Sequence, residues 1–167
     1  SASMKGSYVI DTCLLNGLHF FTGVPDSLLK GLCDELYVRF GVSGDTHIVA
    51  HNEGGALALC AGHYLATKTP GVCYMQNSGL GNTVNPLASL VDKDVYAVPM
   101  LLLIGWRGQG NTEPNHPQHK LQGEITPGLL DVMHIPYTVL EDDDAQFART
   151  IEKAVAFCRK NRRPYAL

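Results

Sequence analysis

A glutamate stands where a short apolar strand runs directly into a helix. The stretch VAHNEGGALALCAGHY, residues 49–64, places Glu53 in the first helical turn, followed at once by Gly54 and Gly55. A carboxylate there interacts favourably with the helix dipole, which is one explanation for it. The two glycines cost the turn about 1–2 kcal/mol relative to alanines, a loss that is tolerable where a flat ligand must approach the backbone. Glu53 is therefore a candidate functional carboxyl, with simple stabilisation of the helix as the alternative.

A glycine-rich turn follows a later strand. The segment QNSGLGN, residues 76–82, could cradle a phosphate at a helix N-terminus. It lacks the Gly-Lys-Ser/Thr of a Walker loop and the third glycine of the dinucleotide fingerprint, which disfavours a flavodoxin-like nucleotide-binding domain. A tight strand-to-helix turn without a ligand is the competing interpretation.

Polar groups also gather in the stretch GWRGQGNTEPNHPQHKLQG, residues 105–123. His116 and His119 would be possible metal ligands on a helix, but Pro117 between them favours an irregular segment. Titration near neutral pH, or donation to an anionic substrate, is the favoured interpretation, and a solvated loop is the alternative.

Apolar patterns divide the chain into alternating helices and strands. Helices are expected over 7–17, 28–40, 53–67, 83–90, 126–134 and 144–161, and strands over 19–22, 46–50, 71–76, 98–105, 136–140 and from 164 onward. This alternation predicts an α/β fold, a three-layer sandwich with a mostly parallel six-stranded sheet. Ligands of such sheets bind beyond the carboxyl ends of the strands, so the candidate segments should meet at one edge.

Bulk properties exclude several classes of function. The chain has 167 residues, 45% apolar and 17% charged, which fits one globular domain. A net charge of -3 predicts no nucleic-acid or membrane-surface partner, and no apolar run is long enough to span a membrane. Five cysteines without a Cys-x-x-Cys pair predict reduced, buried thiols in a cytoplasmic protein. Residues 1–6 are expected to be a tag remnant and N-terminal segment.

Five motifs, in this order and spacing, resemble the pyrimidine-binding domain of thiamine-diphosphate-dependent decarboxylases. They are FFTGVPDSLL, HNEGGALALCAG, MQNSGLGNTVNPLASL, LLLIGWRG, and PQH followed by QG. The sequence looks most like phosphonopyruvate and sulfopyruvate decarboxylases, over nearly the whole chain. The resemblance implies the thiamine-diphosphate-binding fold and identifies residues 7–167 as the pyrimidine-binding domain.

The resemblance also implies roles for the candidate catalytic residues. Glu53 would hydrogen-bond the pyrimidine ring nitrogen, and its proton sharing would favour the imino tautomer that deprotonates the thiazolium. Asp26, or else Ser27, would protonate the enamine left after CO2 departs. His116 and His119 lie where such decarboxylases often place active-site histidines.

Further residues would bind cofactor or substrate by the same resemblance. Arg107 and Lys120 offer fixed positive charge to a phosphonate or sulfonate, with Ser27 beside them. One departure leaves the substrate open, because Asn115-His116 replaces the acidic pair that usually precedes Pro-Gln-His, and the loop 108–114 looks longer. The residues expected to line the cofactor are Gly23, Val24, Pro25, Glu53, Asn77, Leu80 and Asn82.

In that family two α/β domains share the cofactor across a subunit interface. The other domain holds the diphosphate through Mg with a Gly-Asp-Gly motif, and no Gly-Asp-Gly occurs in this sequence. The chain is therefore expected to carry half an active site without metal ligands of its own. A diphosphate-binding domain or beta subunit would complete it in a homo- or hetero-oligomer.

The favoured function is conversion of 3-phosphonopyruvate, a small anionic 2-oxo acid, to phosphonoacetaldehyde and CO2. Such a carboxy-lyase would be inactive without its diphosphate-binding domain. The alternatives are the alpha subunit of a sulfopyruvate decarboxylase and a non-catalytic dimerising module.

Overall fold

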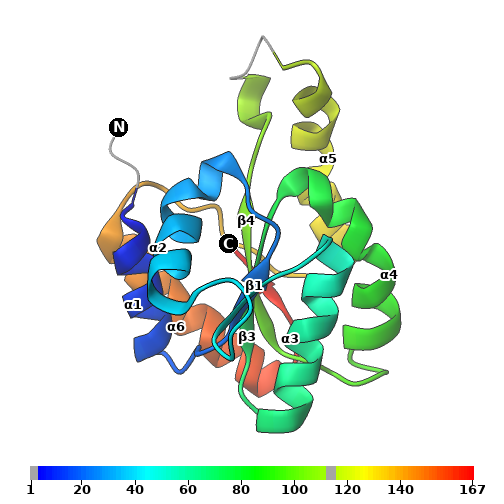
Figure 1. Ribbon diagram of the computed structural model, residues 1–167. Coiled ribbons are helices and arrows are strands. Elements are labelled where there is room, and N and C mark those ends of the chain that lie inside the picture. Colours follow the sequence, from blue (N-terminus) through cyan, green and yellow to red (C-terminus); the bar gives the residue numbers. More distant parts are fainter. Residues whose placement is uncertain (1–3, 112–115) are drawn as a thin grey trace.

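A parallel sheet forms the centre of the molecule. The structure, a computed structural model, describes residues 4–111 and 116–167 (Figure 1), so residues 1–3 of the expected tag remnant and residues 112–114 of the expected longer loop lie outside it. The strand order is β2-β1-β3-β4-β5, and all four pairings are parallel. The strands are β1 (Phe21–Gly23), β2 (His47–Val49), β3 (Gly71–Gln76), β4 (Met100–Gly105) and β5 (Tyr165–Ala166).

The strand expected at 136–140 is reduced to one bridge between Tyr137 and Ala166. The Thr138 N–H donates to the Ala166 carbonyl over 3.0 Å, and the Ala166 N–H donates to the Pro136 carbonyl over 3.0 Å. Pro136 has no N–H with which to extend the ladder, so this edge stays short. The sheet has five strands, and the predicted three-layer α/β fold is confirmed.

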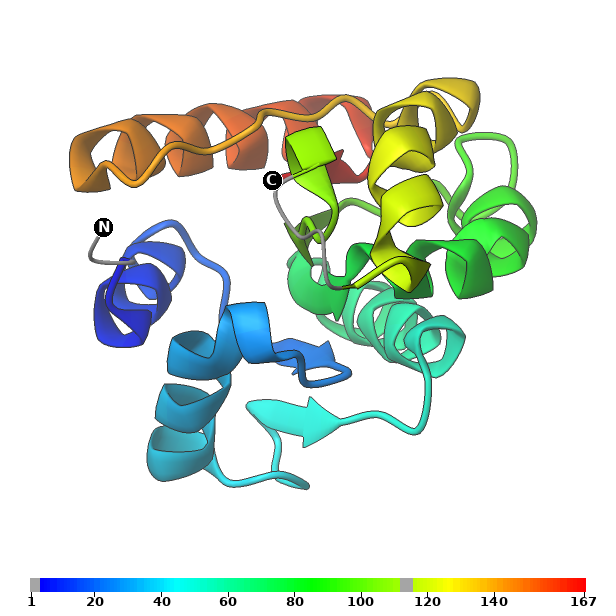
Figure 2. The ribbon, with the colours of Figure 1, turned by 90° about the horizontal axis from the view of Figure 1, so that it is seen from above.

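Helices cover both faces of the sheet (Figures 1 and 2). One layer holds α1 (Gly6–Leu15), α2 (Lys30–Phe40) and α6 (Asp144–Asn161). The other holds α3 (Glu53–Thr67), α5 (Gln118–Val132) and, between them, the short helices η2 (Asn77–Thr83), α4 (Val84–Pro86) and η3 (Leu87–Val91). Alternate residues of β3 enter the two cores, Val72 and Tyr74 facing α1 and α6, Cys73 and Met75 facing α3.

Side chains that cap helix N-termini explain why the predicted starts of two helices are confirmed. The Asn52 side chain accepts the Gly55 N–H over 2.7 Å and begins α3 at Glu53, as expected. Asp143 accepts the Ala145 N–H and begins α6 at Asp144. The helix expected over 83–90 is instead broken into a short α turn and a π turn, and the glycine-rich turn before it forms the 3₁₀ helix η2. Pro86 contributes to this, because it lacks the N–H that a continuous α-helix needs.

The helix expected at 126–134 begins earlier, because α5 already starts at Gln118 and runs through Pro127. Proline removes the N–H that would bond the Gly123 carbonyl, four residues back. The Trp106 Nε1–H donates to that carbonyl instead, over 2.9 Å. Trp106 therefore offsets the lost helical bond and ties the end of β4 to α5.

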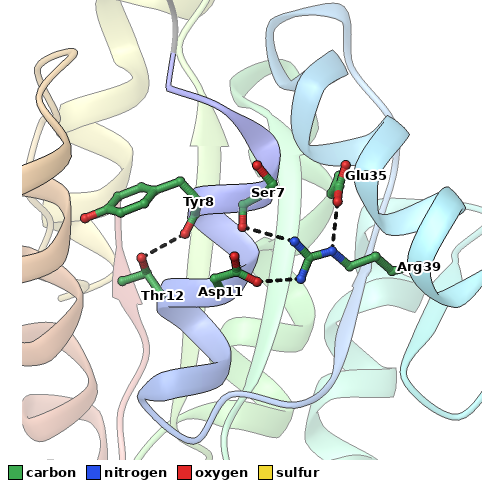
Figure 3. A network of polar contacts seen from close by, with 6 residues as sticks. All are labelled: Ser7, Tyr8, Asp11, Thr12, Glu35 and Arg39. Carbon is green, nitrogen blue, oxygen red and sulfur yellow. Dashed lines mark hydrogen bonds and ion pairs between the residues drawn. The ribbon is translucent and has the colours of Figure 1, made fainter.

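Arg39 joins α2 to α1 (Figure 3). Its Nε donates to Glu35 over 2.8 Å, its Nη1 donates to Asp11 over 2.6 Å, and its Nη2 donates to the Ser7 carbonyl over 3.4 Å. Figure 3 also shows the Thr12 hydroxyl donating to the Tyr8 carbonyl on α1. The contacts of Arg39 with Asp11 and Ser7 hold α1 and α2 together.

The expectation that the cysteines are buried is confirmed. Every cysteine is buried and free of a disulfide. Within residues 4–111 and 116–167, no helix has the length and apolar character needed to cross a membrane.

Candidate active site

The carboxyl ends of β1, β2, β3 and β4 open onto the same edge of the sheet, because every pairing is parallel. The predicted convergence of the strand ends is therefore confirmed. Two carboxyl groups stand at this edge, Glu53 after β2 and Asp26 after β1. The segment 76–82, which begins at the last residue of β3, contacts both.

Glu53 is half-buried at the start of α3 and lies against the η2 segment. Its Oε2 accepts a hydrogen bond from Asn82 Nδ2 over 2.9 Å. Its carboxyl group covers Gly79 so closely that a Cβ at Gly79 would lie within 3.0 Å of Oε1. A Cβ at Gly54 would lie 3.0 Å from the Asn82 carbonyl. Glycines on both sides thus allow the first turn of α3 and η2 to meet around the carboxyl group.

Asp26 caps the short helix η1 (Ser27–Leu29), and its side chain is only 5% exposed. Its Oδ2 accepts the Leu28 N–H over 3.2 Å, and its Oδ1 accepts from Gln76 Nε2 over 2.7 Å. Gly105 at the end of β4 leaves room for this group, since a Cβ there would lie 3.0 Å from Oδ2.

Arg107 faces the same carboxyl group. Its Nη2 lies 3.8 Å from Asp26 Oδ1 and donates to the Ser27 hydroxyl. The guanidinium charge is therefore shared with Asp26, which reduces the positive charge available to an anion. The sequence predicted that Asp26, Ser27 and Arg107 serve the site, and the structure brings all three together.

Asn77 and Leu80 lie beneath this edge. Asn77 is buried, its Oδ1 accepts the Arg107 N–H over 3.0 Å, and its Nδ2 donates to the Arg107 carbonyl and to Thr126 Oγ1 over 3.0 Å each. Leu80 is fully buried in the core beneath α3. Asn77 thus joins β3, β4 and α5, and contact of either side chain with a cofactor stays a prediction.

The turn of Gly23, Val24 and Pro25 packs against Tyr74, which is hydrogen-bonded to buried His47. A side chain at Gly23 would collide with Tyr74, and the Val24 N–H donates to the Tyr74 carbonyl over 3.2 Å. Tyr74 Oη lies 2.7 Å from His47 Nε2, while His47 Nδ1 lies 2.5 Å from the Gly41 carbonyl. Since that carbonyl can only accept, Nδ1 carries the proton and Tyr74 donates to Nε2. Burial lowers the pKa of His47 and raises the pKa of Tyr74.

His116, His119 and Lys120 lie at the start of α5. The two imidazole ring centroids are 5.4 Å apart, His119 is half-buried, and His116 and Lys120 are exposed. The residues that the structure describes contain no cluster of three or more His, Cys, Asp or Glu able to hold a metal ion. His116 and His119 thus lie close together, and their role in catalysis stays a prediction.

Sequence reasoning placed Gln76 and Gly79 in a possible phosphate cradle but gave neither an individual role, and it gave none to Gly105. Gln76 is the only polar side chain of the β3 segment GVCYMQ apart from buried Cys73 and Tyr74, and it stands at the strand end. That position was an available signal. Nothing in the sequence showed that Gln76 would reach a residue 50 positions earlier.

Residues 4–134 match the family described as "Thiamine pyrophosphate enzyme, N-terminal TPP binding domain". The chain belongs to this family. A solved structure from Mycobacterium smegmatis, described as a candidate thiamin diphosphate-dependent enzyme, supports the fold of the TPP-binding domain. It aligns with a TM-score of 0.68 and 17% identity over 99% of this chain and 30% of its own.

Two curated relatives of this TPP-binding domain are named for different substrates. Phosphonopyruvate decarboxylase of Streptomyces viridochromogenes is 33% identical over 86% of this chain, which spans 33% of that relative. Sulfopyruvate decarboxylase subunit alpha of Methanocaldococcus jannaschii is also 33% identical, over 98% of this chain and 92% of its own length. The chain thus spans about one third of the first relative and nearly all of the second.

The edge residues fit part of a thiamine diphosphate site. Gly79 and Gly54 let η2 and the first turn of α3 pack closely around the Glu53 carboxyl group, and a Cβ at Gly81 would meet nothing within 4 Å. A carboxyl group beside such a surface suits a flat ring that carries a nitrogen.

Proposed function

We propose that this chain is the pyrimidine-binding half of a thiamine-diphosphate-dependent 2-oxo-acid decarboxylase. The observation that carries the proposal is the Glu53 carboxyl group, held by Asn82 over bare Gly79 at the strand-end edge of a TPP-binding domain. The names of the curated relatives support the reaction type.

Glu53 would hold and share a proton at a pyrimidine nitrogen. Asn82 fixes Oε2 by donating to it, so proton sharing falls to Oε1 on the Gly79 side. When bound, thiamine diphosphate supplies the carbon nucleophile and the electron sink that decarboxylation requires. The turn of Gly23, Val24 and Pro25 would lie beside the ring.

Asp26 would return a proton to the substrate carbon once CO2 has left. It stands at the same edge as Glu53 and is shielded from water, which suits a group that delivers a proton selectively. Ser27, Arg107 and exposed Lys120 would bind the substrate's anionic group, with His116 and His119 as further donors.

The first substrate to test is 3-phosphonopyruvate, with phosphonoacetaldehyde as the product. Sulfopyruvate is the second, and one observation favours it. The relative named sulfopyruvate decarboxylase subunit alpha matches this chain over 92% of its own length, so the two chains agree in extent.

A partner domain or beta subunit would hold the diphosphate through Mg. The surface of α3 supports such a partner, because Glu53 is the only Asp, Glu, Lys or Arg in the helix. Its exposed face consists of small and apolar residues, among them Gly55, Ala58, Leu59, Gly62, Leu65 and Ala66. An uncharged helix face beside the site is suited to burial against another protein surface.

The decisive experiment measures CO2 release by the complete assembly, this chain with its diphosphate-binding domain or subunit, thiamine diphosphate and Mg. Both 3-phosphonopyruvate and sulfopyruvate are supplied. Glu53→Gln should lower kcat on the better substrate by about 10²-fold or more, as loss of an acid–base group does. Glu152→Gln, an exposed change on α6, is the matched control.

Two outcomes would count against the proposal. Near-normal turnover by Glu53→Gln would remove its central residue. An assembly that forms but releases no CO2 from either substrate would favour the non-catalytic dimerising module.

A further inference from the structure

Asp26 is held from three different elements of the edge. The Leu28 N–H of its own turn bonds Oδ2 over 3.2 Å, which is a local cap. Arg107 approaches from the end of β4 but stays 3.8 Å away and donates to Ser27. Gln76 is the side chain that crosses from β3 and makes a hydrogen bond to Asp26, over 2.7 Å.

The orientation of the Gln76 amide is fixed by its neighbours. The amide NH2 faces Asp26, because Nε2 donates to Asp26 Oδ1 over 2.7 Å. The amide oxygen then points away, and it accepts a hydrogen bond from the Ser78 hydroxyl. A chain of donors therefore runs from Ser78 through Gln76 to Asp26.

The same short segment holds the other carboxyl group of the edge. Gln76 at its start bonds Asp26, and Asn82 at its end bonds Glu53. Gly79 lies between them, and the Glu53 side chain packs directly against it. The relative placement of the two carboxyl groups thus depends on one stretch of seven residues.

We propose that Gln76 is a positioning residue for decarboxylation, which orients the Asp26 carboxyl group toward the substrate while Ser78 locks the Gln76 amide. The inference rests on the proposed function and extends it to a residue that does not itself touch the reacting atoms. Without the Gln76 amide, the carboxyl group would turn toward Arg107, because attraction to a guanidinium grows as the distance shortens.

The kinetic test compares Gln76→Leu and Gln76→Glu in the complete assembly. Gln76→Leu should lower kcat by about 10-fold or more, in line with losing a group that orients a proton donor, and should leave KM within about twofold. Gln146→Leu on α6 is the matched control, since that amide accepts only a local backbone N–H from Glu141.

Gln76→Glu adds a readout that a merely structural role would not move. The introduced carboxyl group can donate to Asp26 only when protonated, so relative activity should recover as the pH falls. Gln76→Leu should keep the shape of the wild-type pH profile at a lower level. The groups facing the introduced carboxyl group are Asp26, Arg107, Ser78 and, beside Asp26 on α2, the Cys33 thiol.

Crystal structures of the wild-type and Gln76→Leu chains give a readout independent of activity. The Asp26 carboxyl group should rotate toward Arg107 in the variant. An unchanged Asp26 side chain, or a Gln76→Leu enzyme with wild-type kcat, would overturn the inference. If the wild-type assembly releases no CO2, the proposed function and the catalytic part of this inference fall together. The crystal structures still decide whether Gln76 holds Asp26.

Discussion

The Glu53 carboxyl group occupies the space in which residue 79 would place a Cβ. Gly79 has a backbone conformation that other residues adopt, since its φ is not positive, so only this contact excludes a side chain. The glutamate and the glycine therefore act as a matched pair across two elements, α3 and η2.

Gly79→Ala should affect function far more than stability. The added methyl group displaces the end of a flexible glutamate side chain, so the free energy of unfolding should change by about 1 kcal/mol or less. The hydrogen bond between Asn82 and Glu53 would be lost, and decarboxylation by the complete assembly should fall by about 10-fold or more. Urea denaturation and a CO2 assay measure the two effects.

Gly128→Ala is the control for that change, because nothing lies within 4 Å of the added Cβ on α5. It should keep full activity and leave the chain as stable or slightly more stable. Full activity in Gly79→Ala would show that Glu53 can move without consequence.

Capping residues explain which parts of the fold were predictable. The bounds of α3, β3 and α6 follow from local signals such as Asn52 and Asp143, which lie next to the residues they cap. The start of α5 was predicted wrongly, at 126 instead of Gln118, and a proline in the interior of a helix is not expected because it removes a hydrogen bond. The compensating donor, Trp106, lies 17 residues before the carbonyl it satisfies.

The candidate site, like the fold, was only partly predictable from the sequence. Parallel strands bring their carboxyl ends together, so the sequence was sufficient to place Asp26, Glu53 and Arg107 at one edge of the sheet. It was not sufficient to pair Gln76 with Asp26, because such a contact depends on side-chain direction and on tertiary packing.

Trp106 and Pro127 should show coupled effects on stability. Trp106→Phe leaves the Gly123 carbonyl without its donor and should cost about 1 kcal/mol of unfolding free energy. Pro127→Ala restores an N–H at the position that helical geometry assigns to this carbonyl. In the Pro127→Ala background, Trp106→Phe should cost less, and a double-mutant cycle in urea measures the difference. Equal costs in both backgrounds would contradict this account of α5.

Burial of His47 should make stability depend on pH. Its pKa is lowered in the folded chain, and it is about 6.5 when unfolded. As the pH falls below about 6.5, the unfolded chain binds the proton first, so the unfolding free energy falls by up to about 1.4 kcal/mol per pH unit until the folded pKa is reached. Above that range the group adds no pH dependence.

His47→Gln should reduce that slope, as urea unfolding at a series of pH values between 7.5 and 5 would show. His63 contributes in the same direction, because burial also lowers its pKa, so part of the slope should remain. An unchanged slope in His47→Gln would mean that His47 already accepts a proton in the folded chain.

Arg39→Leu should destabilise the contact between α1 and α2. The change keeps an apolar stem and removes the donors to Asp11, Glu35 and the Ser7 carbonyl, at a cost of about 1 kcal/mol. Lys30→Leu is the control, because its ion pair with Asp34 is strongly exposed and should not contribute measurably. Thermal melts should show the Arg39 effect shrinking in 1 M salt, since screening already weakens these pairs.

Gln76, Gly79 and Asn82 lie in one stretch, residues 76–82, and this limits where the protein can be re-engineered. A library that varies the interior of that stretch would disturb both acidic groups together, so beneficial combinations there should be rare. Diversity aimed at new substrates belongs instead around His116, His119 and Lys120 at the start of α5, which lies outside that stretch.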